Sequence, residues 1–485
     1  MAMYLNELLE GWVEGSPEVR IGGIGLDNRK IKAGDAFVAV QGQLAHGLDF
    51  ASAAVAAGAV AVIHDGLKAV PQLGVPVAEV KDLGNKLGEL GSRYYSAPSE
   101  QMNIAGVTGT NGKTSVAHFL AQSWQRVYGN AGMVGTLGYG PLGNLQSGAR
   151  TTPDSLRLQQ SLADCVKDGV QHLAMEVSSH ALQQHRCQTV QFDAAVFTNL
   201  TRDHLDYHID MASYAAAKRL LFTEYAPAFA IINHDDAYGK KWFGELNGGM
   251  QMLSFGLLEG AELRAEISSI DIDGMNLKIS GPWGTEQVHT SLLGKFNASN
   301  LLAAAGTLAL LGMPWNRVLH QIELMQPVPG RMMRLGGHTG QPVVVIDYAH
   351  TPDALESALH AVRAHLDGRM VCVFGCGGNR DQGKRPQMGR AAEMLAYDVF
   401  VTSDNPRNES ASQIIEDVMA GLEQPGKATI EPDRAAAIQR AIANCQPGDV
   451  VLVAGKGHET WQEISGQKIP FSDENVIRDA LGDAA

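Results

Sequence analysis

The sequence has few cysteines and few prolines for its 485 residues. The five cysteines (Cys165, Cys187, Cys372, Cys376 and Cys445) are odd in number and widely spaced, unlike a disulfide framework. Cys372 and Cys376 are four apart, but no second pair completes a metal site, so both are interpreted as small buried apolar residues. With 19 prolines against 54 glycines, the chain resembles an enzyme rich in tight turns rather than a disordered or fibrous protein.

Long hydrophobic runs are also missing. The most apolar stretches, 51–63 and 301–313, are shorter than the ~20 residues of a membrane helix. The first residues contain no basic segment followed by an apolar one, so they do not form a signal peptide. We expect a cytoplasmic protein without membrane insertion.

Basic clusters are absent as well. The net charge is −14 and no run of five basic residues occurs, which argues against a nucleic-acid partner. An anionic substrate must therefore be held by local cations. Hydrophobic residues (45%) and charged residues (19%) are in the usual proportion for globular proteins, and the length suggests two to four domains.

Strands alternating with helices along most of the chain predict an α/β fold with mostly parallel sheets covered on both faces. We expect three domains, 1–98, 99–330 and 331–485: a small α/β unit, a central P-loop-type ATPase and a Rossmann-like C-terminal domain. A hairpin is predicted at 264–279 and a helix at 298–311. The predicted strands are 35–40, 59–63, 104–107, 172–176, 194–199, 229–233, 343–347, 370–374, 398–402 and 450–454.

The strongest chemical signal is a glycine-rich loop between a strand and a helix. Glycines let backbone amides turn toward phosphates, and the helix N-terminus adds partial positive charge. Lys113 could bridge terminal phosphates and the Thr114 hydroxyl could bind Mg²⁺. The strict motif needs glycine at 107, where Val107 stands, so the loop is a variant. Its residues are Gly109, Thr110, Asn111, Gly112, Lys113, Thr114 and Ser115.

The loop and six later motifs, in order, resemble the Mur ligase family over nearly the whole chain. The resemblance implies an ATP- and Mg²⁺-dependent amide ligase of bacterial cell-wall synthesis. The motifs are Glu176-Val-Ser-Ser-His180, Thr198-Asn-Leu-Thr-Arg-Asp-His-Leu-Asp-Tyr-His208, Asn297-Ala-Ser-Asn300, Pro329-Gly-Arg331, Asp347-Tyr-Ala-His350, Gly455-Lys-Gly-His-Glu459 and the phosphate loop itself.

The resemblance also implies roles for metal-site residues. Glu176 and His204 would bind Mg²⁺ together with Thr114. Lys218, which by itself would be a solvated charge on a helix, would be carbamylated and hold a second Mg²⁺. A zinc hydrolase site at His204 and His208 is a poor alternative, because leucine stands where the HExxH pattern needs glutamate.

Nucleotide contacts are implied in two further motifs. Asn297 and Asn300 would contact adenine, although capping of the helix that they open is an equal alternative. Arg331 would reach the γ-phosphate, and Asp347, at the end of a strand, would bind ribose.

The uridine diphosphate and the muramoyl dipeptide are expected to bind through the first two domains. A threonine pair and an arginine suit the carboxylates and diphosphate of such a substrate. Asn28 replaces the serine usual in the family. The implied residues are Leu26, Asn28, Gln43, Leu44 and Ala45 for the uridine part, and Thr151, Thr152, Ser178, Gln184 and Arg186 for the dipeptide.

Asp404-Asn405-Pro406-Arg407 follows a predicted strand, where α/β proteins bind ligands. In the resembling family this motif accompanies meso-diaminopimelate, whose extra carboxylate needs a fixed cation. Arg407 and Arg385 would supply cations, and Gly455 and Glu459 would receive the distal ammonium. The alternative is an Asn-Pro turn without a ligand.

We therefore expect a monomeric ligase that joins meso-diaminopimelate to UDP-N-acetylmuramoyl-L-alanyl-D-glutamate through an acyl phosphate. One alternative is the branch that adds D-alanyl-D-alanine, which does not need Arg407. Another is a nucleotide-driven switch or motor. A hydride-transfer enzyme is the weakest, because Arg380 replaces the third glycine of the dinucleotide pattern in 371–378.

Overall fold

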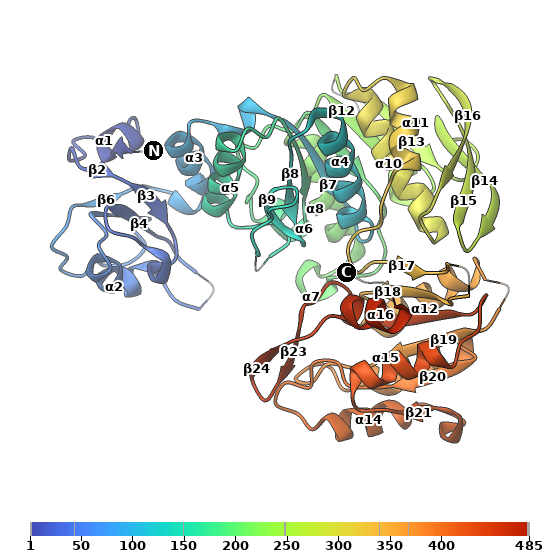
Figure 1. Cartoon of the computed structure of the whole chain (residues 1–485). Coiled ribbons are helices and arrows are strands. Elements are labelled where there is room, and N and C mark those ends of the chain that lie inside the picture. The colour runs from blue at the N-terminus through green and yellow to red at the C-terminus, as the bar shows by residue number, and fades with distance from the viewer. Residues whose placement is uncertain are drawn as a thin grey trace. The chain divides into compact units, whose positions relative to one another are not determined.

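The computed structural model describes residues 2–42, 44–148, 150–246, 249–338, 340–366 and 368–482. The chain separates into two compact units, Met1–Arg264 with Asn300–Val318, and Ala265–Ser299 with Leu319–Ala485. Both units are built from strands and helices in alternation (Figure 1).

The N-terminal part of the first unit is a four-stranded parallel sheet in the order β3-β4-β5-β6. Its strands are short and buried, as Phe37 and Val62 illustrate, which is typical of parallel sheets covered by other elements. The elements are β1 (Met3–Tyr4), α1 (Leu5–Leu8), β2 (Arg20–Ile21), β3 (Gly23–Gly25), η1 (Asn28–Lys30), β4 (Asp35–Ala39), η2 (Gly47–Phe50), α2 (Ala51–Ala56), β5 (Ala61–His64), β6 (Val77–Glu79) and α3 (Leu83–Tyr95).

The rest of the first unit contains part of a larger sheet, with strands in the order β13-β12-β11-β7-β10-β8-β9, and among these only β9 runs antiparallel to its neighbour. Because β7 lies between β10 and β11, their carboxyl ends flank the loop after β7. The elements are η3 (Pro98–Gln101), β7 (Asn103–Thr108), α4 (Lys113–Tyr128), β8 (Ala131–Gly135), β9 (Gly138–Pro141), α5 (Ser155–Lys167), β10 (His172–Glu176), α6 (Ser179–Gln183), β11 (Ala194–Phe197), α7 (Leu205–His208), α8 (Met211–Thr223), β12 (Phe229–Asn233), α9 (Ala237–Glu245) and β13 (Gln251–Gly256).

Between this sheet and the C-terminal domain the chain forms three strands and two helices. β14 starts in the first unit and continues into the second, and β15 and β16 form an antiparallel hairpin. The predicted hairpin at 264–279 corresponds to β14 and β15, and β16 was not predicted. The elements are β14 (Leu263–Asp271), β15 (Gly274–Gly281), β16 (Gly284–Thr290), α10 (Lys295–Leu310) and α11 (Trp315–Glu323).

The C-terminal sheet has the order β17-β18-β22-β19-β20-β21, parallel except for β17. Runs of β-branched residues such as Val343–Asp347 form its buried centre. The elements are β17 (Met333–Gly336), β18 (Val343–Asp347), α12 (Pro352–Arg363), β19 (Met370–Phe374), α13 (Lys384–Leu395), β20 (Asp398–Val401), α14 (Ala411–Met419), η4 (Pro425–Lys427), β21 (Thr429–Ile430), α15 (Arg434–Ala443), β22 (Val450–Ala454), β23 (Trp461–Ile464), β24 (Gln467–Pro470) and α16 (Asp473–Leu481).

The expected α/β fold with parallel sheets is confirmed. The predictions for β10, β12, β18, β19 and β22 match the structure at both ends, whereas β8, β13 and the β23–β24 hairpin were not predicted. Cys372 and Cys376 are buried apolar residues, as expected, and burial raises the pKa of each thiol to about 12. Among the described residues, no helix combines the length and apolar character needed to cross a membrane.

Candidate active site

The glycine-rich loop joins β7 to α4, and two of its glycines are required by geometry. Gly109 and Gly112 have φ values of 154° and 85°, in the region that disfavours side chains. A Cβ atom on Gly109 would collide with Thr198 Oγ1, and one on Gly112 would lie 2.5 Å from Asn300 Oδ1. The loop therefore presents backbone rather than side chains at the start of α4.

Neighbouring strand ends hold this loop. The Asn111 amide donates to Asn199 Oδ1 at 2.9 Å, and Thr198 Oγ1 donates to the Asn111 carbonyl at 2.5 Å, both from the segment after β11. From α8, the Tyr214 hydroxyl lies 3.2 Å from Thr110 Oγ1. The loop is thus fixed before any ligand binds. Tyr214 was not predicted, because its only sequence signal is its position one helical turn before Lys218.

Two lysines contact the loop. Lys113 Nζ donates to the Gly109 and Thr110 carbonyls at 2.8 Å each, and Lys218 Nζ donates to the same Gly109 carbonyl at 2.8 Å. Lys218 is only 1% exposed, so the interpretation of it as a solvated surface charge is wrong. Desolvation, assisted by the positive charge of Lys113, lowers the pKa of Lys218 to about 6.

Glu176, at the carboxyl end of β10, is completely buried, and both of its carboxylate oxygens accept hydrogen bonds. Thr114 Oγ1 donates to its Oε2 at 2.9 Å, and the Thr136 amide donates to its Oε1 at 2.8 Å. Thr136 follows β8, a strand that was not predicted, and no motif pointed to this threonine. The loop threonine and the strand carboxylate, far apart in the sequence, are direct neighbours.

A cavity of about 390 Å³ opens beside this cluster. Four basic side chains face it, of which Lys113, Arg150 and Arg186 are cationic, although the chain as a whole carries a charge of −14. It brings together seven of the predicted site residues and adds Arg150, Ser179 and His180. Its lining is Lys113, Arg150, Thr151, Thr152, Ser178, Ser179, His180, Arg186, His204 and Lys218. This chemistry suits an anionic ligand.

Hydrogen bonds order the dipeptide residues expected on the cavity wall. Thr152 Oγ1 donates to the Glu176 carbonyl at 2.9 Å and accepts from the Ser178 amide at 3.1 Å. Arg186 donates to the Thr152 carbonyl at 3.1 Å and, through Nε, to Gln184 Oε1 at 2.9 Å. Thr151 Oγ1 lies 3.3 Å from Thr136 Oγ1, so this wall continues directly into the Glu176 cluster.

Three histidines gather next to the cavity. The His180 ring lies 5.0 Å from that of His204 and 5.3 Å from that of His208, centre to centre. His208 Nε2 lies 2.8 Å from Ser179 Oγ, and desolvation, together with His180, lowers the pKa of His208 to about 4. His208 is therefore neutral near pH 7. The described residues contain no group of three His, Cys, Asp or Glu side chains close enough to hold a metal by themselves.

The predicted uridine residues follow two adjacent parallel strands. Leu26 and Asn28 come after β3, and Leu44 and Ala45 come after β4, so both groups lie at the carboxyl edge of the sheet. The Ala45 carbonyl accepts from the Gly42 amide at 3.0 Å, and the side chain of Leu44 is fully exposed. Gln43 lies outside the described residues.

In the second unit the predicted residues follow β18, β20 and β22, which end at one edge of the C-terminal sheet. Asp347 accepts from the Met332 amide at 2.9 Å and the Ala349 amide at 2.8 Å, and its desolvation raises its pKa against these bonds. The Arg331 guanidinium lies 5.8 Å from the centre of the Tyr348 ring. Asp347 thus anchors the segment that carries Arg331.

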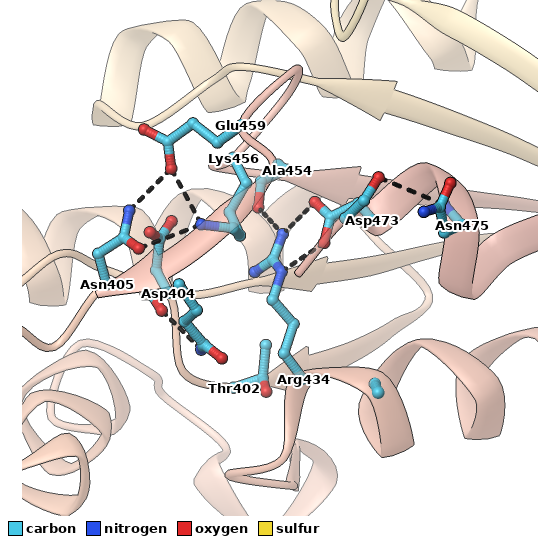
Figure 2. A network of polar contacts seen from close by, with 12 residues as sticks. Thr402, Asp404, Asn405, Arg434, Ala454, Lys456, Glu459, Asp473 and Asn475 are labelled. Atoms are coloured by element: carbon cyan, nitrogen blue, oxygen red, sulfur yellow. Dashed lines mark hydrogen bonds and ion pairs between the residues drawn. The ribbon is translucent and has the colours of Figure 1, made fainter. Parts of the chain in front are cut away.

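Asp404 and Asn405 lie in a buried polar network with two residues of the loop after β22 (Figure 2). Lys456 Nζ donates to Asn405 Oδ1 at 3.1 Å and to Glu459 Oε2 at 2.9 Å, and Asn405 Nδ2 donates to Glu459 Oε2 at 2.8 Å. Desolvation raises the pKa of Asp404, while the nearby cations, including Lys456, oppose the shift. Gly455 lies against the carboxylate of Asp404.

A second buried pair adjoins this network. Arg434 donates through Nε and Nη2 to the Asp473 carboxylate at 2.7 Å each, and Nη2 also donates to the Ala454 carbonyl at 3.0 Å. Both side chains of the pair have no exposed surface. Neither residue was predicted from the sequence, since a lone Arg and Asp on two helices are normally read as solvated charges.

The β23–β24 hairpin fixes the Asp404–Arg407 loop from the other side. The Glu463 amide donates to Asn405 Oδ1 at 2.9 Å, and the Arg407 amide donates to the Glu463 carbonyl at 2.9 Å. Gln462 donates to the Asp404 carbonyl at 2.7 Å. Arg407 has a φ of 52° and donates to the Gly378 carbonyl at 2.7 Å. The turn expected at Pro406 is real, and it is part of a larger polar structure.

The structure gives Arg385 a different environment from the one expected. Its side chain has no exposed surface and donates to Asp417 and to Glu409 at 2.8 Å each. These ion pairs occupy the guanidinium, because two carboxylates already satisfy its charge. Arg385 is therefore not presented as a second cation beside Arg407.

The two asparagines of the Asn297–Asn300 motif lie inside α10, which begins at Lys295. The alternative that these asparagines cap the N-terminus of the helix is therefore wrong. Asn297 Nδ2 donates to the Leu293 carbonyl at 2.8 Å, and both side chains are buried. Asn300, from the first unit, lies against Gly112 of the phosphate loop.

Comparisons with known proteins agree with these observations. Family models match residues 20–95 (Mur ligase family, catalytic domain), 107–308 (Mur ligase middle domain) and 330–457 (Mur ligase, glutamate ligase domain). A curated protein of Alkalilimnicola ehrlichii named UDP-N-acetylmuramoyl-L-alanyl-D-glutamate--2,6-diaminopimelate ligase is 45% identical over 99% of both chains. A protein of the same name from Coxiella burnetii is 43% identical over 99% of both chains.

A solved structure of a UDP-N-acetylmuramoyl-L-alanyl-D-glutamate--2,6-diaminopimelate ligase is also similar. It is 34% identical, covers 99% of both chains and superposes with a TM-score of 0.74. The match therefore includes all three α/β domains. From the family models, the full-length relatives and the shared fold, this chain belongs to the Mur ligase family.

Proposed function

We propose that this chain is an ATP-dependent, ADP-forming amide ligase that joins meso-diaminopimelate to UDP-N-acetylmuramoyl-L-alanyl-D-glutamate in peptidoglycan precursor synthesis. The observation that carries the proposal is the cavity at the phosphate loop, where the cations Lys113 and Arg186 face the same space as the buried amine of Lys218. Full-length relatives named for this reaction support the choice of substrates. ATP and a UDP-linked precursor are cytoplasmic compounds, which supports a cytoplasmic location.

The reaction begins when the free carboxylate of the D-glutamyl residue attacks the γ-phosphate of ATP, which gives an acyl phosphate and ADP. The loop amides and the start of α4 bind the phosphates, with Thr110 and Asn111 in the loop and Ser115 in the first turn of the helix. Lys113 exchanges its bonds to two loop carbonyls for phosphate oxygens. The amine of diaminopimelate then attacks the carbonyl carbon, and phosphate leaves.

Magnesium is the metal that best fits the available donors. Thr114 supplies a hydroxyl and Glu176 a carboxylate, the hard oxygen ligands that Mg²⁺ prefers, and His204 lies on the same cavity. A carbamate on Lys218 would add two anionic oxygens. When bound, the ion would spread the charge that builds up on the transferring phosphoryl group.

The low pKa of Lys218 supports its carbamylation. Only a neutral amine attacks CO₂, and a lysine with a pKa of about 6 is largely neutral near pH 7. The amine bond to CO₂ forms with loss of one proton, and the carbamate anion gains the oxygens that an ammonium lacks. Burial thus prepares Lys218 for the modification.

The remaining site residues divide between three ligands. Leu26, Asn28, Gln43, Leu44 and Ala45 bind the uridine part, and Thr151, Thr152, Ser178, Gln184 and Arg186 the muramoyl dipeptide. Asn297, Asn300, Arg331 and Asp347 contact the nucleotide. Asp404, Asn405, Pro406, Arg407, Gly455 and Glu459 bind diaminopimelate, and Arg385 supports their loop through Glu409. We retain the domain limits 1–98, 99–330 and 331–485.

The test is phosphate release from ATP with Mg²⁺ and the UDP-muramoyl dipeptide, in parallel with meso-diaminopimelate and with L-lysine. We expect release only with diaminopimelate, together with a tripeptide product detected by mass. Equal activity with lysine would contradict the role of Arg407 and leave the ligase reaction standing. No release with either amino acid would overturn the proposed function.

A further inference from the structure

Lys456 has an environment that the proposed chemistry does not use. It follows β22 between two glycines with positive φ, Gly455 at 116° and Gly457 at 54°. Its side chain has no exposed surface, yet its Nζ donates to the Asn405 amide oxygen and to the Glu459 carboxylate. A buried ammonium is stable only with such partners, so the loop is built to direct this charge at these two residues.

The hydrogen bonds of Lys456 determine the orientation of Asn405. Oδ1 accepts from Lys456 Nζ and from the Glu463 amide, which fills both acceptor positions of a carbonyl oxygen. Nδ2 uses one N–H on Glu459 Oε2. Asn405 can therefore offer a ligand only a donor, the second N–H of Nδ2, and a flipped amide would place a donor against two donors.

The same bonds determine which carboxylate oxygen of Glu459 remains available to a ligand. Oε2 accepts from both Lys456 and Asn405, whereas Oε1 has no hydrogen-bond partner among the described residues. The Glu459 side chain is 18% exposed, so it reaches the surface of the network (Figure 2). The network thus presents a donor next to an anionic acceptor, which matches a carboxylate and an ammonium on one carbon.

We propose that Lys456 is a positioning residue that fixes Asn405 and Glu459 as a receptor for the zwitterionic end of the incoming amino acid. This inference rests on the proposed function. Lys456 touches no reacting atom. It acts by holding one donor and one acceptor in place and by balancing the negative charge of Asp404 and Glu459, so that one further ammonium can enter.

The test is Lys456→Met, which keeps the length of the side chain and removes its charge and donors. We expect the KM for meso-diaminopimelate to rise about 10- to 100-fold, as for lost hydrogen bonds to charged groups. The kcat at saturation and the KM for ATP should stay within about twofold, because the phosphate loop is untouched. Lys468→Met, which removes an exposed lysine of the nearby β24, is the matched control and should change neither.

An unchanged KM for diaminopimelate in folded Lys456→Met would overturn the inference. So would a fall in kcat and thermal stability with no selective change in that KM, which would indicate a structural role. If Lys456→Met does not fold, Lys456→Gln, which keeps a hydrogen-bond donor, provides the same test, with a smaller expected rise in the KM for diaminopimelate. Failure of the proposed function is separate, because the unaltered protein would then release no phosphate with diaminopimelate.

Discussion

Lys218 and Lys456, the two buried lysines in the described part of the chain, are almost equally hidden from solvent but have different partners. Lys456 donates to a carboxylate and an amide oxygen, whereas Lys218 donates to one backbone carbonyl and lies near another cation, Lys113. Burial disfavours an ammonium, and only a counter-charge offsets this effect. Burial alone therefore does not determine the charge state of a lysine. The partners of Lys218 favour a neutral amine that can be modified, whereas those of Lys456 stabilise a fixed positive charge.

The backbones that carry these lysines also differ. The loop around Lys456 uses Gly455 and Gly457 at its positive φ positions. The segment leading to α8 and Lys218 uses His204 at 54° and Ile209 at 63° instead. A β-branched residue with a positive φ is strained, and strain of this kind is concentrated at functional sites. The two loops therefore differ in conformational energy as well as in electrostatics.

The largest effect is expected from Lys218→Met. Loss of the carbamate removes the anionic oxygens proposed to balance the metal at the phosphoryl group, so we expect a fall in kcat of about a thousandfold or more. The measurement is steady-state phosphate release. Lys167→Met, on the exposed face of α5, should retain full activity. In the unaltered protein, activity should rise when bicarbonate is added. Near-normal activity of Lys218→Met would contradict the proposed carbamylation and, with it, the contrast between Lys218 and Lys456.

A second prediction concerns the charges beneath the Lys456 network. Asp473→Asn removes the hydrogen-bonded counter-charge of the buried Arg434, and should lower the free energy of unfolding by about 3–5 kcal/mol. The matched control is Asp273→Asn, whose partner Arg334 lies at 2.8 Å but whose own side chain is 72% exposed, and which should change stability by less than about 1 kcal/mol. Urea unfolding measures both. Equal effects would show that burial does not distinguish the two pairs.

The third prediction uses the low pKa of Lys218. Its unfolded pKa is near 10.5 and its folded pKa about 6, so between these values the unfolded chain binds the extra proton and stability rises with pH. Below pH 6 the full penalty of a buried ammonium is present. In bicarbonate-free buffer, Lys218→Met should therefore be more stable than the unaltered protein at pH 5, and this advantage should shrink toward pH 9.

Thermal unfolding at several pH values measures this difference. Lys167→Met, measured in parallel, should follow the unaltered protein at every pH. An advantage of Lys218→Met that stayed constant from pH 5 to pH 9 would contradict the protonation argument and leave only an effect of packing.

Much of this architecture could be predicted because strong local patterns agree with the fold. Buried parallel strands such as β18 and β22 are apolar runs rich in valine, and the Gly-Lys-Thr loop has its own signature. The Mur ligase assignment likewise follows from motifs contiguous in sequence. Glu176 and Thr114 could be named without knowing that they touch.

The rest depended on contacts between distant segments. Lys456 and Glu463 both bond to Asn405, which lies 51 and 58 residues before them, and no periodicity links these positions. Burial of Lys218 depends on the position of α8 beside β7, so a lysine on an alanine-rich helix is indistinguishable in sequence from a solvated one. Arg385 was misjudged for the same reason, since its two carboxylate partners are 24 and 32 residues away.

The smallest effect is expected at Ile209, which adopts φ 63° and ψ −56° with 88% of its surface exposed. The Asp210 amide closes this turn on the His208 carbonyl at 2.6 Å. Ile209→Gly should relieve strain of about 1–3 kcal/mol, less the ~0.5–1 kcal/mol by which glycine's greater unfolded entropy opposes folding. We expect a net gain in stability of about 1 kcal/mol, measured by urea unfolding.

Ile209→Ala is the control for this last change, because it removes the branched side chain but keeps the Cβ atom that strains the turn. It should stabilise the protein less than Ile209→Gly does. If glycine instead lowered stability, the exposed isoleucine would have to make a favourable contact that outweighs its backbone strain. The entry to α8 would then be stabilised by its side chain, and the backbone contrast with the glycine loop around Lys456 would not hold.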